Sequence, residues 1–159
     1  MKRLIFLFAI LSILIFATVV SQNYYKYGNP FFLNGKKSGT ATIDKHTFKL
    51  LLAKTSQAKE IGLSKRDYLA KDTGMLFIFD TADYHAFWAK DMRFPIDILF
   101  IDNNRIVTIF QDVKPQKDQG SLPILKPKEV ASLVLEINAG LSKKYKFHEG
   151  DLVKVENLQ

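Results

Sequence analysis

The chain has 159 residues, of which 47% are hydrophobic, and a formal net charge of +7. This length is enough for one domain with an appendage, and the apolar content is enough for a sizeable core. The absence of cysteine excludes a disulfide framework, a thiolate metal site and a cysteine nucleophile. The lysines are scattered along the sequence, so we interpret the positive charge as a solvated surface and expect no nucleic-acid partner.

Residues 1–21 predict an export signal or a membrane anchor, because Lys2 and Arg3 precede a mostly apolar run at residues 4–20. The apolar part of a signal peptide has roughly 7–15 residues, and a spanning helix needs about 17–25. We therefore favour an uncleaved, single-pass anchor in the cell membrane with the following domain outside. The alternative is cleavage, which would give a secreted or periplasmic protein. Residues 22–38 contain Asn, Gly and Pro without an apolar period and predict a linker.

Residues 39–159 predict one compact, mainly β domain of the sandwich or barrel type, because short runs of strand-forming residues alternate with turn signals. One or two short helices are expected, at residues 55–62 and 139–145, the first capped by Thr55 or Ser56. Residues 114–128 contain three prolines and predict a long exposed loop. The predicted strands are residues 40–43, 47–53, 75–79, 86–90, 97–101, 105–112, 131–138 and 152–155.

A candidate site lies in the stretch 74–102, which contains the only tryptophan of the chain. Alternation along the predicted strand 86–90 places Trp88 and Lys90 on one face. An aromatic ring that stacks and a cation that pairs with an anion would suit one ligand, and Asp91 and Arg93 are close neighbours. The alternative is a tryptophan in the core with a lysine at its edge.

Asp97 and Glu136 are carboxylates inside apolar runs, where a buried acid must be paired or neutral. We favour a structural role, in which each accepts backbone amides or pairs with Lys90, Arg93 or Arg66. The alternative is a functional carboxyl group whose pKa is raised by a pocket.

Several ordered motifs of the sequence resemble the domain of unknown function 192 family of conserved, mostly exported proteins. The matching positions are Gly62, Leu63, Arg66, Asp72, Gly74, Met75, Leu76, Phe77, Phe79, Phe87, Trp88, Lys90, Pro95, Asp97, Ile98, Leu99, Phe100, Ile101, Asp102, Val134, Leu135, Glu136, Asn138, Ala139, Gly140, Gly150 and Asp151. The resemblance spans about residues 47–155 and implies a compact β-sandwich-like domain without an established activity.

This sequence departs from the family pattern at four positions. Ser64 and Ala89 each replace a Met, Asp91 replaces an Asn, and Met92 replaces a Thr. The last two changes fall at the candidate site. They weaken the case for any activity that needs an amide at position 91.

Three functions fit these residues. We favour a binding module at the cell envelope, with a cleft lined by Trp88 and Lys90 for a small or anionic ligand. The first alternative is an envelope hydrolase or lyase that uses carboxylates among Asp91, Asp97 and Glu136, two of which would then lie about 5–10 Å apart. The second alternative is an accessory protein that docks a partner through a large exposed apolar patch.

No cofactor and no metal are expected. The three histidines, His46, His85 and His148, lack the spacing of metal ligands, and the sequence contains no phosphate-binding glycine loop. The sequence does not decide between an enzyme and a binding module.

Overall fold

The computed structural model describes residues 12–15, 17–18, 39–116 and 123–158. Residues 12–15 and 17–18 are helical, and the rest of the predicted anchor at 1–21 and the predicted linker at 22–38 lie outside the described residues. In the part of the chain that is described, no helix combines the length and the hydropathy needed to cross a membrane. Residues 36–159 form a compact unit of their own, to which the following paragraphs apply.

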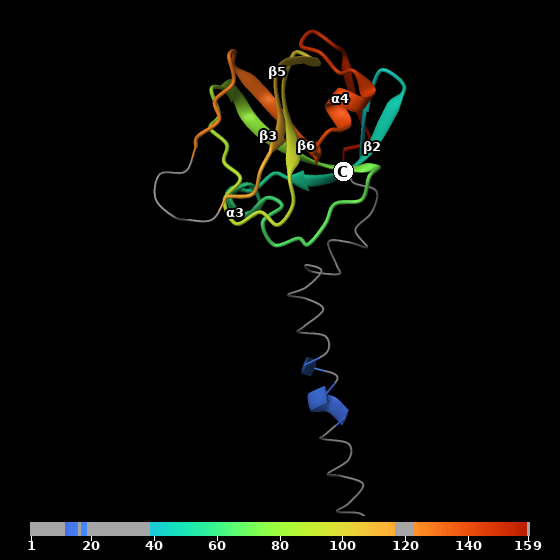
Figure 1. The fold of residues 1–159 in the computed structure, drawn as a ribbon, viewed down its shortest axis with the longest axis vertical. Coiled ribbons are helices and arrows are strands. Elements are labelled where there is room, and N and C mark those ends of the chain that lie inside the picture. The colour runs from blue at the N-terminus through green and yellow to red at the C-terminus, as the bar shows by residue number, and fades with distance from the viewer. Residues whose placement is uncertain (1–11, 16, 19–38, 117–122, 159) are drawn as a thin grey trace, which may run out of the picture. The chain divides into compact units, whose positions relative to one another are not determined.

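The domain is built on one sheet of seven strands, in the spatial order β5-β4-β6-β3-β2-β1-β7 (Figure 1). Neighbouring strands are antiparallel except β2 and β3, which are parallel and are joined through α3. The elements are β1 (Thr40–Ile43), β2 (His46–Ala53), α3 (Ser56–Ile61), β3 (Thr73–Asp83), β4 (Ile96–Asp102), β5 (Arg105–Val113), β6 (Ala131–Asn138), α4 (Leu141–Tyr145) and β7 (Val153–Glu156). The prediction of a mainly β domain with a few short helices is confirmed.

The sheet curls into a half-barrel, because its two edge strands meet at one end. Arg105 at the start of β5 pairs with Leu152 just before β7. The backbone N–H of Ile106 donates to the carbonyl of Asp151 at 3.0 Å. These bonds use backbone groups that an open sheet edge would leave for another chain.

Successive side chains along the strands alternate between two apolar clusters, as the period of two requires. Leu76 and Leu135 belong to an inner cluster, to which all seven strands and α4 contribute. Phe77 and Val134 belong to an outer cluster, which lies on β2, β3, β4 and β6 and is covered by segments near residues 63–69 and 87–94. The central strands are therefore buried on both faces, which explains why β4 and β6 are continuous apolar runs.

Local chemistry explains the short elements. The side chain of Thr55 caps α3 by accepting a hydrogen bond from the N–H of Ala58 at 3.2 Å, and Gly62, with φ +49°, ends the helix. The turn between β4 and β5 is made by Asn103 and Asn104, which both have positive φ. The helix predicted at residues 55–62 is confirmed as α3, and the helix predicted at residues 139–145 is confirmed as α4.

The segment 86–90 differs from its prediction as a strand. Only two of its residues form isolated bridges, Phe87 with Leu125 and Lys90 with Gln116. Its partners are loop residues, so no ladder extends along it. The segment lies instead over the outer cluster, to which Phe87 belongs, and Ala89 is also buried.

Candidate functional site

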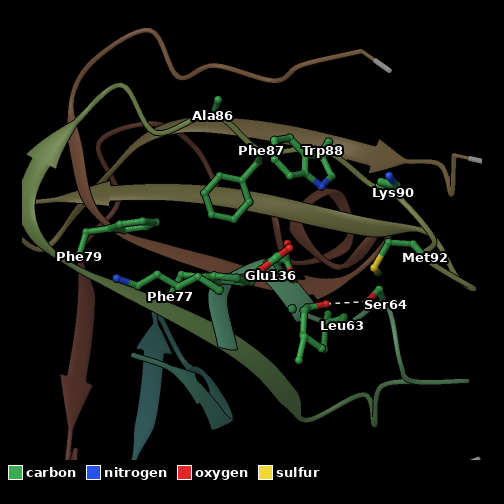
Figure 2. A pocket seen from close by; sticks show the side chains of 14 residues that line it. Leu63, Ser64, Phe77, Phe79, Ala86, Phe87, Trp88, Lys90, Met92 and Glu136 are labelled. Atoms are coloured by element: carbon green, nitrogen blue, oxygen red, sulfur yellow. Dashed lines mark hydrogen bonds between the residues drawn. The ribbon is translucent and has the colours of Figure 1, made fainter. Parts of the chain in front are cut away.

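A pocket of about 240 Å³ opens where the segment 86–92, the helix α3 and the outer face of the sheet meet (Figure 2). Its wall is mostly apolar, and its polar groups are few. It is lined by Lys59, Glu60, Ile61, Gly62, Leu63, Ser64, Phe77, Phe79, Ala86, Phe87, Trp88, Lys90, Met92 and Glu136. A concave, largely apolar site with a few polar groups is the usual form of a small-molecule site, and this volume suits a small ligand.

Glu136 is the buried polar group of the pocket. The strand register places it directly beside Met75 of β3 and Ile98 of β4, so its neighbours on the same face are apolar. Only 4% of the residue is exposed, and among the described residues its Oε2 atom has no hydrogen-bond partner. Burial raises the pKa of Glu136 to about 8, because the apolar surroundings disfavour the charged form. Figure 2 shows its carboxyl group pointing toward the Phe87 and Trp88 rings.

Aromatic rings make one wall of the pocket. Phe87 meets Phe77 edge to face, with ring centroids 5.0 Å apart. Two backbone hydrogen bonds between Phe87 and Leu125, of 2.9 and 2.8 Å, fix the segment in place. Trp88 is next in sequence but is 47% exposed, so its ring belongs partly to the pocket and partly to the surface.

The charged groups that line the pocket are Lys59 and Glu60 of α3 and Lys90 of the segment 86–92, together with Glu136. The Nζ atom of Lys59 lies 4.4 Å from the centroid of the Phe79 ring, a cation–π contact. Apart from Glu136, the charged lining residues in the described part of the chain are thus two lysines and one glutamate.

Asp97 lies away from this pocket. It pairs in register with Ile137, whereas Glu136 pairs with Ile98, so the two acids face opposite sides of the sheet. Asp97 is fully buried and accepts four hydrogen bonds, from the N–H groups of Asp112 (2.8 Å), Gly140 (3.0 Å) and Ser142 (2.9 Å) and from the Ser142 hydroxyl (2.6 Å). It therefore ties β4 to β5 and to the start of α4.

The other two predicted site residues also lie outside the pocket lining. Arg93 is exposed and forms an ion pair with Asp67. Asp91 is exposed, has φ +55°, and donates its backbone N–H to the carbonyl of Gln116 at 3.0 Å. Asn and Asp tolerate this left-handed conformation better than most residues. Asp91 can therefore adopt the left-handed backbone of this position, as the Asn of the family pattern can.

The structure thus brings together Trp88, Lys90 and Glu136 and separates them from Asp91, Arg93 and Asp97. Sequence reasoning missed the contributions of Lys59, Phe77 and Phe87. The family motifs contained a usable signal for the two phenylalanines, because both are positions that match the family pattern. No cluster of three or more metal-ligating side chains occurs in the described part of the chain.

Comparisons with known proteins agree with this architecture. The chain is similar to a crystal structure of a protein of unknown function from Novosphingobium aromaticivorans, with 30% identity and a TM-score of 0.66 over 73% of this chain and 82% of that one. It is equally similar to a crystal structure of a candidate transcription regulator from Sinorhizobium meliloti, with 30% identity and a TM-score of 0.66 over 74% of this chain and 91% of that one. No curated protein matches the chain. The family model described as "Uncharacterized ACR" matches residues 39–155, so the chain belongs to the domain of unknown function 192 family.

Proposed function

We propose that the domain is a binding module whose pocket takes a small ligand between Trp88, Lys90 and Glu136. The observation that carries the proposal is the buried carboxyl group of Glu136, which faces an open pocket and lacks a partner for Oε2 among the described residues. Buried polar groups of folded proteins are nearly always hydrogen-bonded, so an unsatisfied one at the base of a pocket suggests an occupant. The half-exposed Trp88 ring supports the same interpretation.

The proposed hydrolase or lyase finds less support. It was predicted to use two carboxylates among Asp91, Asp97 and Glu136, but Asp97 faces the opposite side of the sheet and Asp91 does not line the pocket. The proposed partner-docking role stays a prediction.

We also propose that the module works outside the cell membrane, held by residues 1–21. The support is the basic start and apolar run of that segment. Because the chain contains no cysteine, a single cysteine introduced at Ser38 would be a unique label. It should react with an impermeant thiol reagent in intact cells, and labelling only after lysis would contradict this location.

Ligand binding can be tested on the full-length protein, because Trp88 is its only tryptophan and reports on the pocket directly. A panel of small organic acids, amines and neutral compounds should contain some that change the Trp88 emission and raise the melting temperature, since a ligand of the native state stabilises it. Trp88→Ala should weaken such a ligand roughly tenfold, measured by calorimetry, because it loses a stacking surface.

Tyr68→Ala is the matched control, because Tyr68 is an exposed aromatic residue outside the pocket lining. It should leave the affinity unchanged. Equal weakening by both substitutions, or a panel in which no compound binds, would contradict the proposed function.

A further inference from the structure

The base of the pocket sets a condition on its occupant. Glu136 is flanked by Met75 and Ile98, and the described lining offers no partner to its Oε2 atom. In this apolar setting an ionised carboxylate is costly, whereas a protonated one can donate a hydrogen bond. An occupant that presents an oxygen acceptor at its inner end would satisfy the group without burying a charge.

The outer part of the pocket sets a second condition. The charged groups that face it are Lys59 and Glu60 from α3 and Lys90 from the segment 86–92. The neighbouring positions on β3 and β4 are apolar, and Asp97 faces the other side of the sheet. Among the described lining residues, two lysines lie against one exposed-side glutamate, Glu60, which favours a negatively charged group on the occupant over a positively charged one.

The middle of the pocket is apolar and small. Phe77, Phe87 and Met92 line it, and the volume of about 240 Å³ lies below the roughly 300–1,000 Å³ of sites for drug-sized ligands. A single ring or a short branched chain would fill it, with the Trp88 ring against its outer part.

We infer that the pocket binds a small organic anion with an apolar body, which accepts a hydrogen bond from the uncharged carboxyl group of Glu136 at its inner end and places its charge near Lys59 and Lys90. The inference rests on the proposed function and specifies its ligand class. It assigns Glu136 as a hydrogen-bond donor rather than as an ion-pair partner or a nucleophile.

This arrangement couples binding to a proton. The pKa of Glu136 is raised to about 8 by burial, so the acid form is the main form at neutral pH. Above that pH the carboxylate cannot donate and repels the anion, so affinity should fall by up to about tenfold for each further pH unit. A cationic ligand would show the opposite trend, because it would bind the carboxylate.

Three probes with the same ring test the inference: 4-methoxybenzoate, 4-methoxybenzylamine and 4-methoxybenzyl alcohol. Each is titrated into the full-length protein from about pH 6 to about pH 9, with the emission of Trp88 as the signal. We expect the benzoate to bind most tightly and to weaken above about pH 8. 4-Methylbenzoate, which lacks the ether oxygen, should bind roughly fivefold to tenfold more weakly than 4-methoxybenzoate, as expected for loss of one hydrogen bond.

Glu136→Gln keeps a neutral donor at the same place, so it should retain benzoate binding and lose the pH dependence. Glu129→Gln is the control, because Glu129 is exposed and lies outside the pocket lining. Calorimetry of the unmodified protein in buffers of different ionisation enthalpy gives an independent measure that needs no variant. Proton uptake should accompany benzoate binding near pH 8.

The possible outcomes distinguish an error in the ligand class from an error in the proposed function. Tighter binding of the amine than of the benzoate, or benzoate binding that is independent of pH and takes up no proton, would overturn the inference and leave the proposed function in place. Failure of all three probes while other compounds change the Trp88 emission would also refute only the ligand class. Absence of any binding across the wider panel would refute the proposed function as well.

Discussion

Two buried acids on adjacent strands of the sheet have opposite surroundings. Asp97 of β4 accepts four hydrogen bonds from three residues on the inner side, at 2.6–3.0 Å. Glu136 of β6 lies on the outer side between apolar neighbours, and its Oε2 has no partner among the described residues. Burial alone therefore does not describe the environment of a buried acid, and the number of donors around its oxygens distinguishes these two.

The difference also shows in how each acid is held. Three backbone N–H groups and one hydroxyl group hold the Asp97 carboxylate in place. Around Glu136 desolvation is the cause that raises the pKa to about 8. Asp97 thus ties β4 to β5 and to the start of α4, whereas Glu136 lines a pocket.

The largest expected effect comes from removing the satisfied acid. Asp97→Ala would leave the buried N–H and hydroxyl of Ser142 and the N–H of Gly140 without their acceptor. Each unsatisfied buried group costs about 1–3 kcal/mol, so the free energy of unfolding should fall by on the order of 5 kcal/mol. Denaturant unfolding measures this loss.

Asp97→Asn keeps the shape and one acceptor oxygen, so it should cost clearly less than Asp97→Ala. A loss below about 1 kcal/mol for Asp97→Ala would contradict the structural role and remove the contrast with Glu136.

The sequence allowed much of this architecture to be predicted, because hydrophobic alternation and turn residues are local. Both acids were identified as buried from their apolar runs. Their roles were not separable, because the donors to Asp97 come from Asp112, Gly140 and Ser142, which lie 15, 43 and 45 residues away. The curling of the sheet, which decides which face is interior, depends on long-range pairing and leaves no local pattern.

The segment 86–90 also shows that long-range pairing cannot be predicted from a local sequence pattern. Its alternation predicted a strand, and Trp88 and Lys90 do line one pocket. However, Phe87 lines it too, and the segment is held by bridges to Leu125 and Gln116 rather than by a ladder. The prediction of the shared pocket was therefore useful even though the element was wrong.

The second prediction concerns the stability contributed by protonated Glu136. Its pKa in the folded protein, about 8, is above the ordinary value of 4.5. Between these values the unfolded chain has released the proton and the native state retains it, so stability falls as pH rises, by roughly 1.4 kcal/mol per pH unit. Glu136→Gln cannot titrate and should lack this contribution.

The unfolding free energy of the unmodified protein relative to Glu136→Gln should therefore decrease by about 2 kcal/mol between about pH 6 and about pH 8. Below about pH 4 the difference should no longer depend on pH, because both states hold the proton. Glu129→Gln serves again as the control, since Glu129 is exposed. Parallel pH profiles for the unmodified protein and Glu136→Gln would show that Glu136 is not buried as an acid.

Substitutions of Asp91 should have the smallest effects on stability. Asp91 is the third acid among the predicted site residues and, unlike Asp97 and Glu136, it is not buried. Its side chain is exposed and its backbone is left-handed, with φ +55°. Asp91→Asn should change stability by less than about 0.5 kcal/mol, because Asn adopts this conformation readily. Asp91→Ala should cost about 1 kcal/mol, because a left-handed backbone is unfavourable for a residue whose side chain cannot bond locally, and Asp91→Gly should recover most of that loss.

All three variants should bind ligand as the unmodified protein does, measured by the emission of Trp88. Loss of binding in Asp91→Asn at unchanged stability would instead place the Asp91 carboxylate in the site, and the function would then have to be sought in a pair of acids across the pocket mouth.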